Sequence, residues 1–250
     1  RTRADKVERR YLLSGQKIWT STAKDASKIL LLARTSQPDP AARRTDGLTL
    51  FYTDLDRNRI EVREIEKMGR AAVDSNQIFI DGLMVSEAQR IGEEGKGFSY
   101  LLDSLNPERI LIAAEALGIG KTALRRAVDY AGERIVFGRP IGQNQSIQHP
   151  LAESWIELEA ASLLIAKAAN LYDSGAPAGG MANAAKYFAA EAGFKAATNA
   201  VMTLGGMGYA KEYHVERLLR ESLIPRLAPV SAQMVLNYIG ERVLGLPKSY

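Results

Sequence analysis

The 250-residue chain contains no cysteine and only two histidines, His149 and His214. The absence of cysteine excludes disulfide scaffolds, cysteine nucleophiles and zinc ribbons. Because the two histidines are far apart in the sequence, we expect no histidine-built metal site and no bound metal. No apolar run approaches the roughly 18 residues of a transmembrane helix. The basic N-terminus lacks the apolar segment of a signal peptide, so we expect neither a membrane span nor a secretory signal.

Charge gives little indication of a nucleic-acid partner. The net charge is +4, and the excess lies in residues 1–92, which hold 17 Lys and Arg against 13 Asp and Glu. These cations are scattered and few aromatics lie near them, which argues against a nucleic-acid groove. The distribution fits an ordinary solvated surface best, and it is also compatible with an anionic small ligand.

The sequence predicts two domains, a β-domain over residues 1–91 and a helical domain over 92–250. Short runs rich in Ile, Leu, Val and aromatics, separated by turn residues, predict strands at 11–13, 28–33, 48–52, 60–65 and 77–80. Their spacing is typical of an antiparallel sheet or a small barrel, and the lack of interleaved helices excludes a Rossmann domain.

Residues 92–250 have helical periodicity and glycine or proline stops. We expect long helices at 101–131, 146–174, 182–204 and 231–244, with a shorter piece at 211–220. Four long helices with short joints indicate a four-helix bundle, so the fold class is α+β. The second and third helices hold many alanines, which suggests that helices also pack between subunits.

The first long helix carries an unusual acid. Pro107 interrupts its apolar pattern, which predicts either a kink or a helix restarting there with Asn106 as its cap. Glu108 follows directly and is spaced to face the apolar Leu105 and Ile112. A carboxylate in that position is costly unless it is paired, hydrated or used in chemistry. It is therefore either an ion pair at the bundle edge or a functional acid.

Three further stretches have a functional interpretation, and two of them also have a structural one. Trp19 with Thr20 and Ser21 at a strand end is either a core residue beside a strand edge or an aromatic platform with small donors. The stretch 134–145 combines arginine, phenylalanine and glycine at a helix exit and could hold a phosphate, because guanidinium matches phosphate geometry. The glycines at 205–208 form either an interhelical joint or a close approach to a ligand.

Taken together and in order, these motifs resemble the acyl-CoA dehydrogenase family of flavoproteins. The motifs are YLLSGQKIWTSTA, LNPERILIAAEALG, YAGERIVFGRPIGQNQ, LGGMGYAKEYHVERLLRE and GERVLG, and they cover essentially the whole chain. The resemblance implies the family's middle β-domain followed by its C-terminal helical bundle. The chain begins where the family's β-domain is already under way, so we expect the N-terminal helical domain to be truncated or supplied by another polypeptide.

The resemblance implies FAD as the cofactor. Trp19, Thr20 and Ser21 would lie against the flavin ring of their own subunit, with Ser21 near its reactive nitrogen. Residues expected to reach the pyrophosphate and adenine of a neighbour's FAD are Arg134, Phe137, Gln145, Met202, Gly205 and Gly206. Met202 stands where the family commonly has glutamine, and Leu204 where it often has a polar residue. Ser231 and Gln233 match a family contact to flavin.

The family's chemistry removes a proton from the carbon next to a thioester and transfers a hydride to flavin. The base is a carboxylate that most members keep in the loop before the last helix, where this chain has Pro229. A smaller group, which includes the isovaleryl-CoA and long-chain enzymes, keeps it on the first bundle helix directly before an arginine. Glu108 and Arg109 match that position, so Glu108 is the expected base.

The resemblance also implies a substrate site. Asn106, Pro107 and Arg109 would line the acyl pocket beside Glu108. Pro229 has no N–H for the thioester carbonyl, so either Val230 donates in its place or a hydroxyl of the flavin side chain carries the contact.

We therefore expect FAD-dependent dehydrogenation of an acyl-CoA in fatty acid metabolism. Two alternatives stay open: an oxygen-reacting flavoenzyme such as an acyl-CoA oxidase or monooxygenase, and a non-catalytic subunit of the same fold. The expected partners are acyl-CoA, an electron-transfer flavoprotein and further copies of the chain in a dimer of dimers with FAD at the interface. The expected location is the bacterial cytoplasm, with the mitochondrial matrix and the peroxisome also open.

Overall fold

A computed structural model describes residues 2–37, 41 and 43–248. The chain divides into two compact units, Arg1–Ser104 and Leu105–Tyr250. The division falls inside the first long helix, α1 (Gly97–Glu133). The first turns of α1 belong with the first unit because Gly97 lies against the backbone of Thr49 and Leu50. Among the described residues, no helix is both long and apolar enough to cross a membrane.

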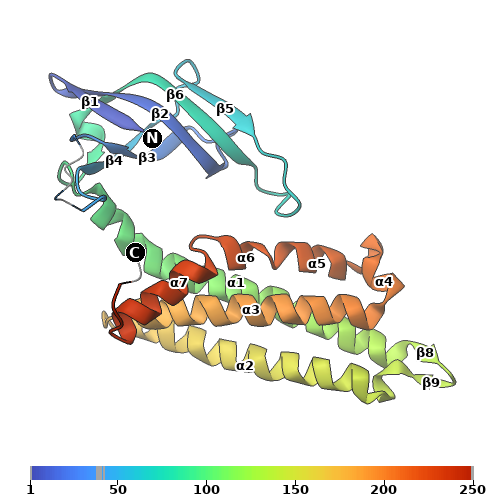
Figure 1. The fold of residues 1–250 in the computed structure, drawn as a ribbon. Coiled ribbons are helices and arrows are strands. Elements are labelled where there is room, and N and C mark those ends of the chain that lie inside the picture. The colour runs from blue at the N-terminus through green and yellow to red at the C-terminus, as the bar shows by residue number, and fades with distance from the viewer. Residues whose placement is uncertain (1, 38–40, 42, 249–250) are drawn as a thin grey trace. The chain divides into compact units, whose positions relative to one another are not determined.

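The first unit is built on a seven-stranded sheet in the order β5-β6-β2-β1-β3-β4-β7 (Figure 1). The strands are β1 Arg3–Val7, β2 Arg10–Ser21, β3 Lys28–Arg34, β4 Leu48–Asp54, β5 Ile60–Glu64, β6 Ser75–Ser86 and β7 Arg90–Ile91. All five predicted strands are present. The sheet is antiparallel except for the β1–β3 pair, which is parallel. β5 and β7 lie at opposite ends of the pairing order of the described strands, which argues against a closed barrel.

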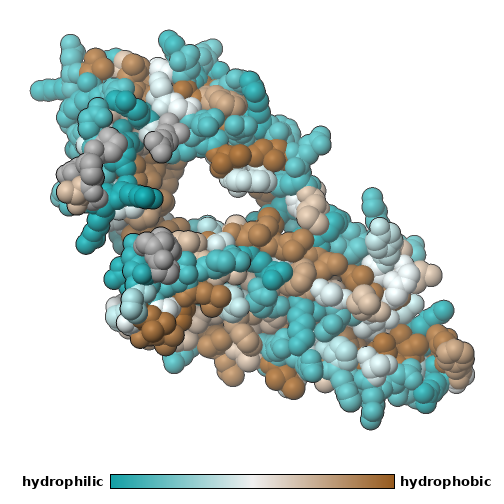
Figure 2. Space-filling view, in the orientation of Figure 1, coloured by the Kyte–Doolittle hydropathy of each residue, from teal (hydrophilic) through white to brown (hydrophobic). Residues whose placement is uncertain are grey.

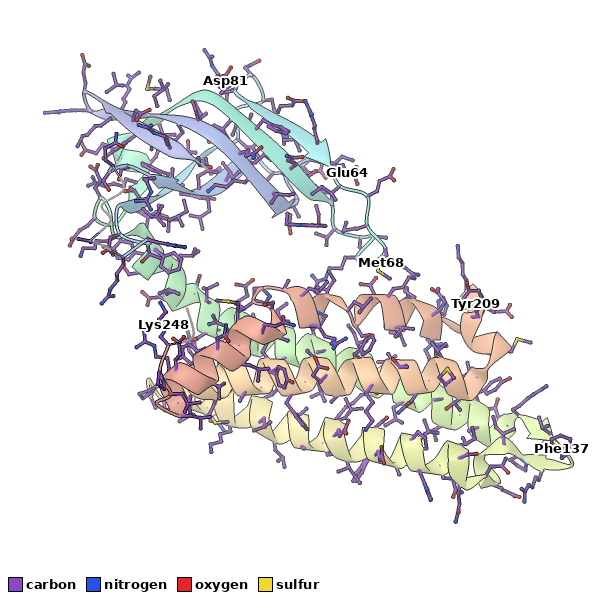
Figure 3. All side chains as sticks on the ribbon, in the orientation of Figure 1. Glu64, Met68, Asp81, Phe137, Tyr209 and Lys248 are labelled. Carbon is purple, nitrogen blue, oxygen red and sulfur yellow. The ribbon has the colours of Figure 1, made fainter. Side chains whose placement is uncertain are left out.

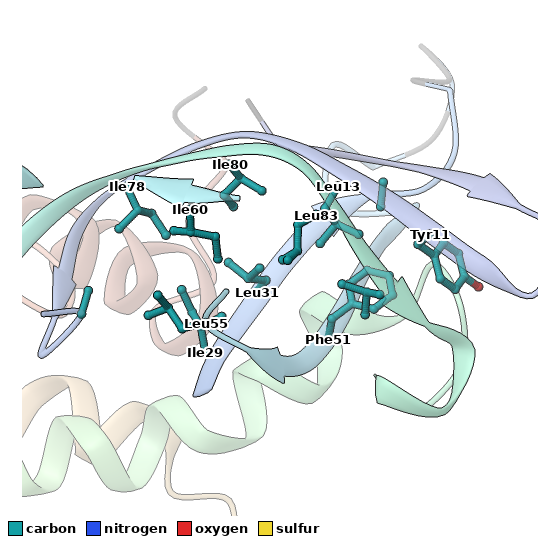
Figure 4. Close-up of a cluster of buried hydrophobic side chains, with 14 residues drawn as sticks. Tyr11, Leu13, Ile29, Leu31, Phe51, Leu55, Ile60, Ile78, Ile80 and Leu83 are labelled. Atoms are coloured by element: carbon teal, nitrogen blue, oxygen red, sulfur yellow. The ribbon is translucent and has the colours of Figure 1, made fainter. Parts of the chain in front are cut away.

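The core of the first unit lies on one face of the curved sheet (Figure 4). Strand residues alternate between this core and the opposite face, as the two-residue period of a strand requires. In β3, Ile29, Leu31 and Ala33 are buried, whereas Leu30 between them is half exposed. Tyr11 and Phe51 meet edge-to-face at the end of this core, with ring centroids 5.0 Å apart.

The second unit is a helical bundle in which α1, α2 and α3 run side by side (Figure 1). The remaining elements are α2 Gln145–Asp173, α3 Gly179–Leu204, α4 Gly206–Tyr209, α5 Val215–Glu221, α6 Ile224–Leu227 and α7 Ala232–Tyr238, with a small hairpin of β8 Ile135–Val136 and β9 Arg139–Pro140 between α1 and α2. The final helix predicted at 231–244 is present over residues 232–243, but it is not α-helical throughout. α7 has seven residues and passes at Ile239 into a π-helical turn that contains Gly240, a poor helix former.

Two further expectations about the helices are corrected. α1 is continuous with Pro107 inside it, so a new helix does not start there with Asn106 as its cap. The alanines of α3 do not form an intersubunit face, because most of them are buried within their own unit (Ala182, Ala185, Ala189, Ala190, Ala192, Ala196, Ala197 and Ala200). α3 is the central helix, packed against α2, α5 and α7, so small side chains are needed on several of its faces.

Candidate active site

Glu108 projects from α1 as an exposed carboxylate. Its expected apolar neighbours do not enclose it, because a helix face alone does not bury a side chain. Among the described residues Glu108 has no salt-bridge partner, although its charge acts on the adjacent Arg109. The interpretation of Glu108 as an ion pair at the bundle edge therefore loses its main support.

Arg109 and Asn106 lie about one helical turn apart on α1, and their half-buried polar side chains contact each other. The Nη1 of Arg109 donates to the Oδ1 of Asn106 at 3.2 Å. Burial lowers the pKa of Arg109, while Tyr238 of α7 and Glu108 act in the opposite direction. The Nε of Arg109 is buried and has no hydrogen-bond partner among the described residues. Pro107, which lies between Asn106 and Glu108 in the sequence, is also half-buried.

Lys186 links α3 to the segment before α7. Its side chain is buried, with 1% exposed, and its Nζ donates to the carbonyl oxygen of Val230 at 2.5 Å. Desolvation by burial, followed by the charge of Arg109, lowers the pKa of Lys186 to about 8. The segment contains a cis peptide bond between Ala228 and Pro229 and leads into Ser231, the N-cap of α7. The structure thus brings Val230 into the same polar region as Arg109.

The titration of Lys186 predicts a pH-dependent stability. The pKa of Lys186 is about 8 in the folded protein and 10.5 in an unfolded chain, so between these values the unfolded state binds more protons. Below pH 8 the buried ammonium is charged, and its full free-energy cost lowers the stability. Between pH 8 and 10.5 the free energy of unfolding rises with pH, by up to about 3 kcal/mol. Urea unfolding of the wild type and Lys186→Met should show this rise in the wild type alone. Parallel pH curves for the two proteins would contradict the prediction.

The Trp19 motif occupies an irregular end of β2. The pairing of β2 with β6 shifts register between Lys17 and Thr20, and Trp19 has a left-handed φ of 62°. The indole is 60% exposed, so the interpretation of Trp19 as a core residue is wrong. The Nδ2 of the buried Asn76 donates to the carbonyl of Thr20 at 3.0 Å and fixes the strand beyond the irregularity. Ser21 next to it is exposed, so the motif offers an open aromatic surface with a hydroxyl beside it.

The residues expected to meet a neighbour's FAD surround the β8–β9 hairpin. Phe137 occupies its tip with a left-handed φ of 51° and a fully exposed ring (Figure 3). Arg134 precedes β8 and Gln145 opens α2, and both are exposed. Twenty-five helical residues, 109–133, lie between Glu108 and Arg134, a rise of roughly 40 Å at 1.5 Å per residue. One chain therefore presents this group and Glu108 far apart along the axis of α1.

The remaining expected cofactor residues lie at two helix ends. Met202 is 74% exposed near the end of α3, whereas Leu204 is buried in the bundle. Gly205 has a φ of +60°, and no atom lies within 4 Å of a Cβ built on Gly205 or Gly206. The backbone here is open to a ligand. At the other end, Gln233 is exposed in the first turn of α7.

Both units of the chain match known protein-family models. Residues 1–83 match the model of the acyl-CoA dehydrogenase middle domain, and residues 95–244 match that of the acyl-CoA dehydrogenase C-terminal domain. The chain belongs to the acyl-CoA dehydrogenase family. The two matched segments correspond to the sheet and to the helical bundle, so the α+β architecture is that of these two family domains.

Individual members of the acyl-CoA dehydrogenase family resemble the chain along nearly its whole length. The protein named acyl-CoA dehydrogenase fadE12 from Mycobacterium bovis is 38% identical over 96% of the chain. The structure of butyryl-CoA dehydrogenase from Megasphaera elsdenii superposes with a TM-score of 0.92 at 31% identity, covering 98% of this chain and 63% of that one. The prolyl acyl carrier protein oxidase AnaB gives 0.91 at 28% identity, covering 98% and 64%. The chain spans 62% of the length of the fadE12 relative.

The acyl-CoA dehydrogenase motifs led to most of the candidate site residues, but not to Lys186 or Tyr238. A sequence signal for Lys186 was available, because it is the one charged residue in the alanine- and aromatic-rich stretch Ala184 to Ala190. A charge on that helix face requires a partner inside the protein. The partner, a backbone carbonyl 44 residues away, cannot be inferred from sequence spacing.

Proposed function

We propose that the holoenzyme is an FAD-dependent acyl-CoA dehydrogenase in which Glu108 removes the proton next to the thioester. FAD, when bound, supplies the acceptor for the hydride from the following carbon. Glu108 offers an exposed carboxylate, and Asn106, Pro107 and Arg109 line the acyl pocket beside it. General-base catalysis requires such a group within hydrogen-bond reach of the acidic carbon.

The observation that carries this proposal is the link from the Glu108 turn, through Arg109 and Lys186, to Val230 beside Pro229. Residues 222–240 contain no Asp or Glu, so that segment provides no base. Arg109, next to Glu108, acts electrostatically on Lys186, and Lys186 binds Val230. A carboxylate on α1 can therefore serve the same region of the bundle that Pro229 occupies.

The residues available fit FAD. Trp19 exposes an indole that can lie against a flat ring, and Ser21 places a hydroxyl beside it. Arg134 is an exposed guanidinium without a salt-bridge partner among the described residues, which suits a pyrophosphate. Gly205 and Gly206 leave space for a dinucleotide.

The proposal includes a homo-oligomer with FAD at the subunit interface. One chain presents its hairpin and Glu108 far apart along the axis of α1, so the hairpin suits the cofactor of a neighbouring subunit. Exposed apolar side chains on α1 and α2 suit contacts between copies, and the visible face of the bundle shows hydrophobic areas among the hydrophilic surface (Figure 2). We propose an electron-transfer flavoprotein as the electron acceptor and the bacterial cytoplasm as the location.

Anaerobic mixing of the holoenzyme with acyl-CoA tests the function. The visible absorbance of oxidised flavin should be lost within the time of a few turnovers. A protein purified without flavin absorbance would contradict the proposal and favour a non-catalytic subunit.

An oxygen-reacting enzyme is a second candidate, because the structural relative AnaB is named an oxidase. The rate at which air reoxidises the reduced protein separates the two functions. Slow reoxidation in air and fast reoxidation by an electron-transfer flavoprotein are expected for the dehydrogenase, and the reverse for an oxidase.

Loss of the Arg134 guanidinium should weaken FAD binding. A charge-assisted hydrogen bond contributes about 1.5–3 kcal/mol, so Arg134→Ala should raise the dissociation constant of FAD about 10- to 100-fold. Titration of apoprotein by flavin fluorescence measures this constant. Arg10→Ala removes an exposed arginine at the start of β2 and serves as the charge-matched control. Equal FAD affinity in Arg134→Ala and the control would remove Arg134 from the cofactor site.

A further inference from the structure

Lys186 is a lysine in the most apolar part of the bundle. It lies on α3 between buried alanines at 185 and 189, and only 1% of the residue is exposed. Burial of an ammonium group is costly unless strong hydrogen bonds replace its hydration. A leucine or methionine would fill this space at lower cost, so the charge requires an explanation beyond packing.

The partner of Lys186 is a peptide group rather than a carboxylate. Its Nζ donates to the Val230 carbonyl at 2.5 Å. In a planar trans peptide the carbonyl and the following N–H point in opposite directions. Holding the Val230 carbonyl therefore directs the N–H of Ser231 away from Lys186. Among the described residues this N–H has no hydrogen-bond acceptor, whereas the Ser231 side chain accepts from the Met234 N–H.

Proton abstraction next to a thioester places negative charge on the carbonyl oxygen, which a fixed N–H donor stabilises. Pro229 has no N–H to offer. The next peptide units in the chain are those of Val230 and Ser231, and the second of these has its orientation fixed by Lys186. Arg109 places a second positive charge in the same region.

We propose that Lys186 is a positioning residue that orients the Val230–Ser231 peptide, so that its N–H binds the thioester carbonyl in place of the donor that Pro229 lacks. This inference rests on the proposed acyl-CoA dehydrogenase function. Lys186 itself does not touch substrate. It acts by fixing the orientation of the peptide. The developing negative charge is stabilised by the N–H, which lies in the same peptide plane and points away from Lys186.

The test compares Lys186→Met with wild-type holoenzyme. Lys186→Met keeps the length of the side chain and removes the donor. The rate of flavin reduction at saturating acyl-CoA should fall about 10- to 1000-fold, the range for a lost or misplaced oxyanion donor. The KM for acyl-CoA should change much less, because the contact strengthens as charge develops. Lys195→Met on the same helix is the control, because Lys195 binds the carboxylates of Glu153 and Glu157 at the surface.

A spectroscopic readout separates positioning from stability. Acetoacetyl-CoA bound to the oxidised holoenzyme forms an enolate with its own ultraviolet absorbance. Lys186→Met should raise the apparent pKa of enolate formation by one unit or more, and Lys195→Met should leave it unchanged. If Lys186→Met does not fold, Lys186→Gln, which is shorter and keeps a neutral donor, is measured in its place.

Two results would overturn the inference. The first is an enolate pKa and a reduction rate within twofold of wild type. The second is a lower rate that follows FAD loss or a lower melting temperature while the enolate pKa stays the same. Failure of the wild-type protein to reduce its flavin with acyl-CoA would instead reject the proposed function itself.

Discussion

Replacement of Glu108 by glutamine in the holoenzyme is expected to leave FAD bound and to lower the rate of flavin reduction by acyl-CoA about 10²- to 10⁴-fold, the contribution of a positioned general base. Glutamine keeps the size and hydrogen-bonding capacity of the side chain but cannot accept the proton. Glu108 is exposed on α1 and has no salt-bridge partner among the described residues, so the substitution should leave the fold intact. Stopped-flow absorbance under anaerobic conditions measures the rate.

The matched control for this experiment is Glu115→Gln. Glu115 lies seven residues further along α1, which places it two turns away on the same side of the helix. Its replacement should change the reduction rate less than twofold. Undiminished reduction in Glu108→Gln would reject Glu108 as the base, and an equal loss in both variants would indicate a general effect on the helix.

Replacement of Gly193 by alanine should destabilise the bundle by about 2–3 kcal/mol, the cost of forcing a methyl group into a tightly packed contact. A Cβ on Gly193 would lie 2.5 Å from the backbone oxygen of Ala116. Across the same contact, a Cβ on Gly120 would lie 2.9 Å from the Cα of Gly193. Backbone atoms cannot rotate away as a side chain can, so α1 and α3 must move apart. Urea unfolding measures the change.

Gly118→Ala provides the control for the helix contact. Gly118 is two residues from Gly120 on α1, and no atom lies within 4 Å of a Cβ built there. Alanine is a better helix former than glycine, so this variant should gain about 0.5–1 kcal/mol. Equal and small effects of Gly193→Ala and Gly118→Ala would show that the two helices approach less closely than the structure indicates.

The strands and long helices could be predicted because their apolar periodicity is local. β1 was missed because it lacks such a local pattern. Only Ala4 of its five residues is buried, and the strand is held by its neighbours in the sheet. The extent of the last helix was predicted, but its change at Ile239 to a π-helical turn was not, because the apolar pattern continues through Gly240. Periodicity indicates which residues can share a face, but not how the backbone continues.

The candidate site was only partly predictable, because its contacts join distant segments. Glu108 and Trp19 belong to short motifs that a family resemblance can identify. The exposure of Trp19 depends on a register shift between β2 and β6, which hydrophobicity does not reveal. The contact between Lys186 and Val230 depends on how α3 packs against the segment before α7. Small alanines on α3 likewise suggested an intersubunit face, although most of them are buried in their own unit, where α3 packs against α2, α5 and α7.

The most direct test of Glu108 as the base is a structure of the oligomeric holoenzyme with FAD and an acyl-CoA ligand. The decisive measurement is the distance from the Glu108 carboxylate to the carbon next to the thioester. We predict a separation of about 3–3.5 Å, as expected for groups poised to react, with the flavin ring on the opposite face of the ligand. A Glu108 carboxylate that points into solvent, with another acid at the acyl chain, would contradict the assignment.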